Sequence, residues 1–266
     1  MSIGHTLHYS LDQTHVKECE AMVELVDKGW NSKTTIREMY KSMWTILYEI
    51  IWYQKYSDEV CREKIHNLDA FIEYCDEIAK DKGLIITTCH LGNWELCSRI
   101  ISRYYRPISS AYKPHKKEWV NQLILSSRNQ HNQTTISKEG GLLPLIRALK
   151  KKECIGLIID QHGGKNGVDS EFLDKPCKSW DSVIQMAYRT QCPIIPVTFI
   201  RKVDGFHAHF IKDFQLVLDE NRKLDIQKSV VKLDQALSDL VCLAPEQWLW
   251  LGRRWSRDFK TMMASS

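Results

Sequence analysis

His90 and Glu95 are the residues of this chain whose types and spacing best suit proton transfer. They begin and end the string His-Leu-Gly-Asn-Trp-Glu, which follows an apolar segment, residues 84–88, expected to be a strand. An imidazole can accept a proton near neutral pH, and a nearby carboxylate can fix its tautomer and stabilise its charged form. The spacing exceeds that of helical i,i+4 neighbours, so it needs a bend, which Gly92 can provide. The string therefore predicts a general base, His90, with Glu95 as its partner.

The string HLGNWE resembles the catalytic motif of the lysophospholipid acyltransferase superfamily. In this form the motif is similar to that of the late acyltransferases of lipid A biosynthesis, which transfer a lauroyl, myristoyl or similar chain. Three further segments occur in the order of that family: Asp160-Gln161 after an apolar strand, residues 193–196 (PIIP), and residues 245–255 (PEQWLWLGRRW). Together with the histidine string they extend the resemblance over roughly residues 35–260.

This resemblance implies an enzyme that moves a fatty acyl chain from an acyl-carrier-protein or acyl-CoA thioester to a hydroxyl or amine. The acceptor would be a membrane glycolipid or lysolipid, such as a lipid A precursor. An alcohol is a poor nucleophile at neutral pH, so a positioned base accelerates such a transfer by about 10²–10⁴. Neither a cofactor nor a covalent enzyme intermediate is required. The expected location is the cytoplasmic side of the inner membrane, with the chain bound peripherally.

Three more residues receive roles from the resemblance. Arg128 matches an arginine that the family keeps near the end of a helix, and its guanidinium can bind a phosphate of the acceptor or of the donor's phosphopantetheine with two hydrogen bonds. Asp160, at the end of its strand, can orient Gln161, Arg128 or His90. Asp160 and Gln161 are therefore predicted to contribute to substrate binding.

Two other positions near these motifs have competing interpretations. Asn93 is predicted either to bind substrate or to cap the helix that follows it, and Trp94 beside it can simply pack. Glu171 is an alternative to Glu95 as the partner of the histidine. It lies in a stretch, residues 170–176, that departs from the family pattern.

Other catalytic chemistries are less well supported. No Gly-x-Ser-x-Gly elbow of a serine hydrolase occurs. His207 and His209 alternate on a predicted strand and form half of a metal site, but no third ligand follows at a suitable spacing, so no metal is predicted. Cys89 is interpreted as a small buried residue rather than as a nucleophile.

Composition indicates a folded protein that works in a reducing compartment. The 266 residues are 43% hydrophobic and 26% charged, and the nine cysteines form no Cys-x-x-Cys pair. The net charge is +4, with cations grouped at 113–117, 150–152 and 253–260. These groups are typical of a solvated face, and on a shared face they would suit an anionic membrane surface, an acidic carrier protein or a phosphorylated glycolipid. Nucleic acid is not predicted as a partner, because no binding motif accompanies the charge.

The N-terminal region shows neither a signal peptide nor an apolar run long enough to span a membrane. Its longest apolar run, residues 42–53, is interrupted by Glu49, and a span needs about 20 residues. Family members usually carry an N-terminal transmembrane anchor, so we expect a peripheral protein, an anchorless branch or a trimmed chain. The bulky residues of this run, Trp44, Tyr48, Trp52 and Tyr53, suit either a membrane-lying helix or core packing.

The order of elements predicts an α/β fold with a mostly parallel central sheet flanked by helices, of the glycerolphosphate-acyltransferase type. Residues 1–15 are expected to be loosely ordered, 16–82 helical and packed on the core, and 83–260 the acyltransferase core of a single domain. Predicted strands are 84–88, 107–112, 134–137, 154–159, 194–201 and 206–212. Predicted helices include 58–80, 93–104, 118–129, 142–152, 179–190 and 225–241. His90 and Asp160 then both fall at the carboxyl ends of strands, where α/β proteins bind ligands.

Two alternatives to this function remain open. The same fold could transfer acyl chains to another acceptor, such as a phosphatidylinositol mannoside, an ornithine lipid or a different aminolipid. It could also bind lipid without turnover, although His90 and Glu95 argue for catalysis. Chain length, donor carrier, acceptor and oligomeric state cannot be read from these residues.

Overall fold

The computed structural model describes residues 2–55, 57–112, 114, 117–128, 132–137, 141–218 and 221–255. The helices are α1 (Ser2–Leu11), α2 (Gln13–Val26), α3 (Ser32–Lys55), α4 (Asp58–Glu63), α5 (Leu68–Ala79), α6 (Trp94–Tyr104), α7 (Glu118–Arg128), α8 (Leu143–Lys150), α9 (Ser182–Thr190), α10 (Arg222–Cys242) and the 3₁₀ turn η2 (Pro245–Gln247). The strands are β1 (Ile65–His66), β2 (Leu84–Thr88), β3 (Ile108–Tyr112), β4 (Gln133–Ser137), β5 (Cys154–Ile158), β6 (Val168–Phe172), β7 (Lys175–Ser179), β8 (Ile194–Arg201) and β9 (Phe206–Phe210).

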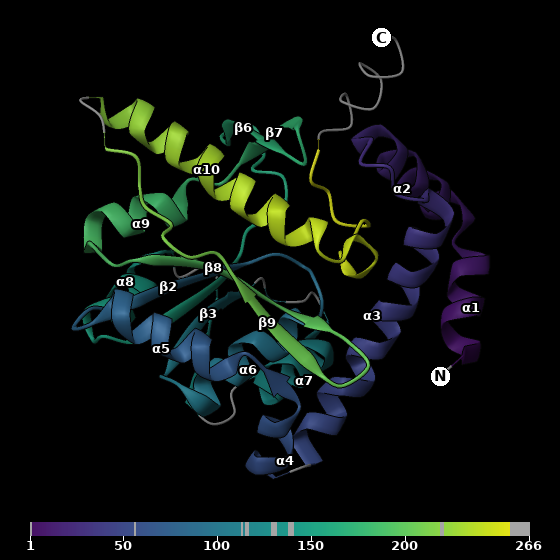
Figure 1. The fold of residues 1–266 in the computed structure, drawn as a ribbon, viewed down its shortest axis with the longest axis horizontal. Helices are drawn as coiled ribbons and strands as arrows, with labels where there is room; N and C mark the ends of the chain where they lie inside the picture. The colour runs from purple at the N-terminus through teal and green to yellow at the C-terminus, as the bar shows by residue number, and fades with distance from the viewer. Residues whose placement is uncertain are drawn as a thin grey trace.

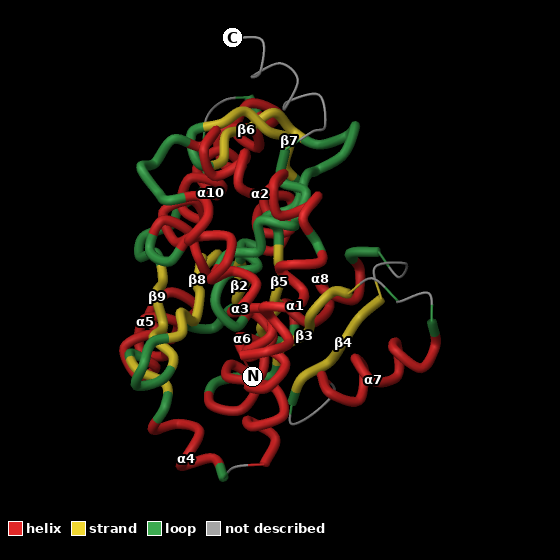
Figure 2. Tube along the Cα trace, turned by 90° about the vertical axis from the view of Figure 1, so that its right-hand side faces the viewer, coloured by secondary structure: helices red, strands yellow, loops and turns green. Residues whose placement is uncertain are grey.

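Seven of these strands form the central sheet, in the order β1-β9-β8-β2-β5-β3-β4. Strands β8, β2, β5, β3 and β4 run parallel to one another, and β9 pairs antiparallel with β8. Figure 2 shows the sheet running from β9 on one side to β4 on the other. The predicted α/β class with a mostly parallel sheet is confirmed.

Helices cover both faces of the sheet, as the continuous apolar sequence of its central strands requires. In β2 the side chains of Leu84 and Ile86 pack in one buried cluster with α5 and α6, whereas Ile85 packs in another with α8, α9 and α10. Figure 1 shows α10 and α9 above the sheet and α5, α6 and α7 below it. The loops that carry the predicted motifs begin where β2 and β5 end.

Two segments differ from the sequence prediction because tertiary contacts decide them. The helix predicted over residues 58–80 is divided into α4 and α5, since residues 65–66 pair with β9 and Asn67 adopts the left-handed conformation, at φ 61°. The hairpin of β6 and β7 was not predicted. Its turn residues, Leu173 and Asp174, have positive φ without the glycine or asparagine that usually signals such a turn.

The N-terminal segment, for which the sequence analysis expected loose order, contains the helix α1. This helix packs on α3, with the His8 ring 4.9 Å from the Tyr40 ring and 6.2 Å from the Trp44 ring. The contacts with α3 explain a helix that the local sequence does not signal.

The bulky residues of α3 divide between the core and the surface. Tyr53 is 3% exposed and packs in the core, whereas Trp44 and Tyr48 are 40% and 51% exposed. The side chain of Trp52 lies outside the described part of the chain. Among the described residues, no helix combines the length and apolar character that crossing a bilayer requires.

The described residues include only part of the cation groups noted in the sequence. Lys150 and its two neighbours are exposed, as expected of a solvated face. Arg254 departs from that expectation, because its side chain is buried and pairs with Asp234 on α10, with 2.8 Å between Nη2 and Oδ2. Lys113, Lys116, Arg257 and Lys260 lie outside the described residues.

The loop between β2 and α6 is fixed on two sides. Gly92 forms a bridge with Phe199 of β8 and donates its N–H to the carbonyl of Gln247, at 3.2 Å. Leu91 forms a second bridge, with Trp248, just after η2. Gly92 has φ +62°, and a Cβ there would lie 2.1 Å from the carbonyl oxygen of Phe199. The glycine therefore serves the close approach of two backbones as well as the bend.

We expect Gly92→Ala to destabilise the fold more than Gly29→Ala does. Gly29 has a similar φ, +74°, but a Cβ there would meet nothing within 4 Å. Both variants carry the cost of a left-handed alanine, roughly 1–2 kcal/mol, and Gly92→Ala adds an overpacking cost of about 1–3 kcal/mol. Urea unfolding measures the difference, and equal losses in the two variants would show that the close approach is absent.

Candidate active site

The His90 ring is held by Asp160, which comes from the neighbouring strand. Thr88 pairs with Ile158 in the register of β2 and β5, so His90 and Asp160 each stand two residues beyond that pair. Nδ1 of His90 lies 2.7 Å from Oδ1 of Asp160, and the backbone N–H of His90 donates to Oδ2, also at 2.7 Å. Of the three orienting roles predicted for Asp160, the structure has the one that acts on His90.

The C-terminal segment completes this arrangement. The indole N–H of Trp248, a residue 1% exposed, donates to Oδ2 of Asp160 at 2.8 Å, and the N–H of Leu249 donates to the carbonyl of His90 at 2.9 Å. Trp248 was not among the predicted site residues. Its position within PEQWLWLGRRW was visible in the sequence, but its partner was not.

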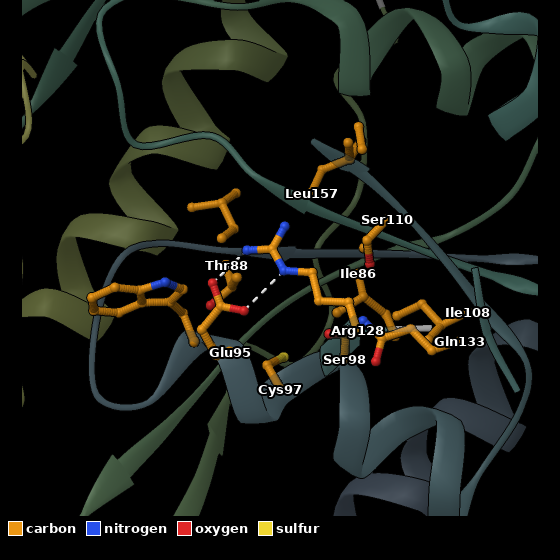
Figure 3. A pocket seen from close by; sticks show the side chains of 14 residues that line it. Ile86, Thr88, Glu95, Cys97, Ser98, Ile108, Ser110, Arg128, Gln133 and Leu157 are labelled. Carbon is orange, nitrogen blue, oxygen red and sulfur yellow. Dashed lines mark hydrogen bonds and ion pairs between the residues drawn. The ribbon is translucent and has the colours of Figure 1, made fainter. Parts of the chain in front are cut away.

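The hydrogen bond expected between Glu95 and the His90 ring is not formed among the described residues, although the charge of Glu95 acts on the ring. Glu95, in the first turn of α6, pairs instead with Arg128 at the end of α7. Nε of Arg128 donates to Oε2 at 2.9 Å, and Nη2 donates to Oε1. In Figure 3 the two groups face each other, and the third guanidinium nitrogen points away from the carboxylate. The five-residue spacing places Glu95 on the helix, while the register of the sheet brings Asp160 to the ring.

The charges around His90 shift its pKa in opposing directions. Burial lowers the pKa of His90, but the charge of Asp160 and the hydrogen bond to it outweigh burial, so the pKa lies above the ordinary 6.5. The charge of Glu95 also raises this pKa, although Arg128 opposes it. Burial raises the pKa of Asp160, but the charge and hydrogen bonds of His90, with the Trp248 hydrogen bond, bring it below 3.8. The side chain of His90 keeps 19% of its surface exposed, so the ring is accessible.

A pocket opens beside this site, between α6, α7 and the face of the sheet. Its floor is the apolar row Ile86, Ile108 and Gly156, where Gly156 lacks the side chain that would meet Ile108 at 3.0 Å. The Glu95–Arg128 pair lies at its wall, and Gln133 and Ser98 are hydrogen-bonded to each other at 2.8 Å (Figure 3). The pocket is thus mainly apolar, with an ion pair beside it.

Asn93 does not face this pocket, which corrects its prediction as a substrate-binding residue. It is fully buried, and its side-chain oxygen accepts the N–H of Leu96 to cap α6, at 3.1 Å. Its amide donates to Glu49 of α3 at 2.8 Å, and Glu49 in turn binds Arg201 at the end of β8 through both carboxylate oxygens. Sequence reasoning missed Glu49 and Arg201, although Glu49 was visible as the single acid within an apolar run.

The remaining predicted residues lie as follows. Gln161 is exposed, and its carbonyl accepts a hydrogen bond from Arg254 at 3.3 Å. Glu171 is exposed on β6, in the hairpin outside the central sheet, so Asp160 and not Glu171 binds His90.

Cys89 is fully buried, and burial raises the pKa of its thiol, which agrees with the structural interpretation. All nine cysteines fall in the described part of the chain, and none of them forms a disulfide.

A model of the family of bacterial lipid A biosynthesis acyltransferases matches residues 30–257. The chain belongs to this family. The matched range includes the histidine string, both sides of the pocket and the C-terminal segment that binds Asp160. The resemblance first noted in the motifs is therefore confirmed over most of the chain.

Individual members of the family are distant relatives. The palmitoleoyltransferase of lipid A biosynthesis from Escherichia coli (strain K12) is 23% identical over 68% of this chain and 57% of its own length. The lauroyltransferase of the same strain is 24% identical over 70% of this chain and 59% of its own. A lipid A biosynthesis acyltransferase of Haemophilus influenzae is 22% identical over 65% and 54%. The matches thus cover a little more than half of each relative's length.

We expect Asp160→Asn to lower the pKa of His90 below 6.5, because burial then acts on the ring without the opposing charge. Histidine ring resonances followed by NMR against pH give this value. His162 serves as the control. Burial and the charges of Arg254 and Lys178 hold its pKa below 6.5, and this pKa should be the same in the variant as in the parent. An unchanged His90 pKa in the variant would contradict the assigned contact.

The same shifts predict how stability varies with pH. A raised His90 pKa contributes stability that is fully present below pH 6.5 and is lost as the pH rises through the folded-state pKa. A lowered Asp160 pKa contributes stability that is present above pH 3.8 and is lost as the pH falls through its folded-state value. In Asp160→Asn the contribution of Asp160 is absent, and the His90 contribution changes sign because the pKa of the ring then lies below 6.5. Urea unfolding at a series of pH values measures both effects, and parallel curves for the two proteins would contradict the linkage.

Removal of the Glu49 side chain should lower the free energy of unfolding more than removal of an exposed acid does. The side chains of Glu49 and Arg201 are only 12% and 18% exposed, and loss of one partner from a buried pair costs about 3–5 kcal/mol. The control is Asp81→Ala. The side chains of Asp81 and Lys152 are 94% and 61% exposed, so their ion pair should contribute at most about 1 kcal/mol. Denaturant unfolding of Glu49→Ala and Asp81→Ala compares them, and similar losses would show that the Glu49 network is weak.

Proposed function

We propose that this protein transfers a fatty acyl chain from an acyl-carrier-protein or acyl-CoA thioester to a hydroxyl, or an amine, of a membrane glycolipid such as a lipid A precursor. The observation that carries the proposal is the accessible His90 ring, bound through Nδ1 to buried Asp160, beside an apolar pocket. Two relatives of the chain are named as a palmitoleoyltransferase and a lauroyltransferase of lipid A biosynthesis, which agrees with this chemistry.

The hydrogen bond to Asp160 determines which ring nitrogen acts as the base. With Nδ1–H donated to the carboxylate, Nε2 carries the lone pair. The acceptor oxygen attacks the thioester carbonyl while its proton passes to Nε2. The C–S bond then breaks, and the proton moves from the imidazolium to the departing thiolate sulfur. Asp160 stabilises the imidazolium throughout, as the acid of a serine protease triad does.

Arg128 and Glu95 are proposed to act at the mouth of the pocket rather than as part of this proton transfer. Glu95 fixes the plane of the guanidinium through two contacts, so the remaining nitrogen is positioned for an anion. A phosphate of the acceptor, or of the donor's phosphopantetheine, would supply that anion. The charge of Glu95 still favours a protonated His90, so removal of Glu95 should affect the base as well.

The pocket suits the hydrocarbon part of the substrate. Its floor residues Ile86, Ile108 and Gly156 lie on the face of the sheet that α6 and α7 cover, and hydrocarbon entering there is removed from water. Burial of each methylene contributes about 0.8 kcal/mol.

Peripheral binding at the cytoplasmic side of the inner membrane is part of the proposal. It is supported by Trp44 and Tyr48, exposed on α3, and by Leu7 and Leu11, which are 57% and 76% exposed on α1. Aromatic side chains are favoured at the membrane interface, where one end of the ring is apolar and the other polar.

Substitution of His90 tests the proposal. Purified His90→Ala should transfer radiolabelled acyl chains to extracted lipid about 10²–10⁴ times more slowly than the parent protein, because the base is absent. Cys89→Ala is the matched control, since it alters the neighbouring side chain and should keep activity within a few-fold if the thiol takes no part. Circular dichroism checks that each variant is folded. Full activity in His90→Ala would refute the assigned base.

The acceptor and the chain length are identified together by mass spectrometry. The gene should be expressed in a strain that lacks its own late acyltransferases, and intact lipids compared with those of cells expressing His90→Ala. A new acylated lipid A species in the parent only is the expected result. An acylated aminolipid would move the proposal to a different acceptor, and tight lipid binding without any new species would favour a protein that does not turn over.

A further inference from the structure

Two histidines distant in sequence lie side by side at the edge of the sheet. His66 on β1 pairs with His207 on β9 in parallel register, so both side chains leave the same face of the sheet. Their rings are stacked, with centroids 4.4 Å apart and an interplanar angle of 23°. Two imidazoles at this separation can share a ligand or a proton.

A carboxylate lies between their Nε2 atoms. Asp204, in the turn between β8 and β9, places Oδ1 2.9 Å from Nε2 of His207 and Oδ2 3.4 Å from Nε2 of His66. The hydrogen bond from His207 lowers the pKa of Asp204, so the carboxylate is charged. One donor atom from each residue lies within 4.8 Å of the other two, and no other three His, Cys, Asp or Glu residues in the described part of the chain are grouped in this way.

The turn is held against β1 by its backbone. The N–H of Phe206 donates to the carbonyl of Lys64 at 2.7 Å. A Cβ on Gly205, which has φ +148°, would lie 2.3 Å from that carbonyl oxygen, so only glycine permits this approach. Asp204 is therefore positioned by a constrained turn, even though its side chain is 57% exposed.

We propose that His66, Asp204 and His207 bind a first-row transition-metal ion, with Zn²⁺ the preferred species and water in the fourth position. Imidazole and carboxylate are its usual ligands, and tetrahedral coordination with Zn–N and Zn–O bonds of about 2.0–2.1 Å separates the ligand atoms by about 3.3 Å. The 2.9 Å and 3.4 Å separations to Asp204 are close to that value. The hard cations Mg²⁺ and Ca²⁺, which require more oxygen ligands, do not suit this set.

Metal binding requires a small rearrangement of the rings. A ligating imidazole holds the ion near its own plane, so the stacked rings must rotate about Cβ–Cγ until both Nε2 lone pairs point to one position. The side chains of His66 and His207 are 36% and 17% exposed, which leaves room for this rotation. The ion also replaces any Nε2 proton, so affinity should fall as the pH is lowered.

The proposed site shares only His207 with the pair that the sequence analysis weighed, His207 and His209. His209 stands opposite Thr198 of β8 and is absent from the group of donors. The other ligands come from a strand and a turn that are 138 residues apart in sequence, so local spacing could not reveal them. The role that follows is structural, because the ion would join the two-residue edge strand β1 to the β8–β9 turn.

Zinc binding to the untagged, chelator-treated protein tests the proposal independently of acyl transfer. The protein carries Cys242→Ser, since Cys242 is the one exposed cysteine. Isothermal titration with ZnCl₂ should give one site, and thermal unfolding should shift upward with ZnCl₂ but not with MgCl₂. His66→Ala and His207→Ala should each weaken binding at least about tenfold, since even indirect partners of a metal typically contribute that much.

The matched control is His15→Ala. His8 and His15 also share one acid, Asp12, at 3.8 Å and 2.5 Å, but the three do not form a convergent group. Zinc affinity should be unchanged in this variant. The proposal is overturned if the parent protein binds no Zn²⁺, or if His66→Ala and His207→Ala bind it as tightly as the parent does.

Discussion

The site depends on one buried charge interaction, between Asp160 and the ring of His90. A carboxylate that is 4% exposed is costly to bury unless hydrogen bonds compensate for the lost water. Here the His90 ring, the His90 backbone and the Trp248 indole each donate to it. These three contacts tie the end of β2, the end of β5 and the C-terminal segment together. Because the acid is anchored so fully, the ring it binds has a defined orientation.

The parallel sheet makes this interaction possible. Adjacent parallel strands end at the same edge, so residues at equivalent positions past β2 and β5 meet without any special loop. Gly92 then lets the chain turn against β8, and Asn93 starts α6 with its side chain buried on Glu49. The helix in turn carries Glu95 to Arg128 at the pocket wall. The His90–Asp160 contact and the Glu95–Arg128 pair are thereby both placed near the start of one helix.

The sequence predicts the strands and helices of the α/β core well, because buried parallel strands such as residues 84–88 are short, apolar and bounded by turn residues. It also singles out His90, Glu95, Arg128 and Asp160, which the structure brings close to one another. It does not predict which acid meets which base, since the i to i+5 spacing suggested Glu95 and only the pairing of β2 with β5 brings Asp160 to the ring. Trp248, Glu49 and Arg201 were missed for the same reason: each acts through a partner far away in the chain. The break between α4 and α5 depends likewise on pairing with β9.

The central claim is that Asp160 holds Nδ1 of His90 and leaves Nε2 as the base. Nitrogen-15 NMR of ring-labelled histidine, at a pH above the His90 pKa, reports directly which nitrogen carries the proton. The structure predicts a protonated Nδ1, and an Nε2 with the shift of an unprotonated imidazole nitrogen. A spectrum in which Nε2 carries the proton would contradict the contact with Asp160 and the direction of proton transfer built on it.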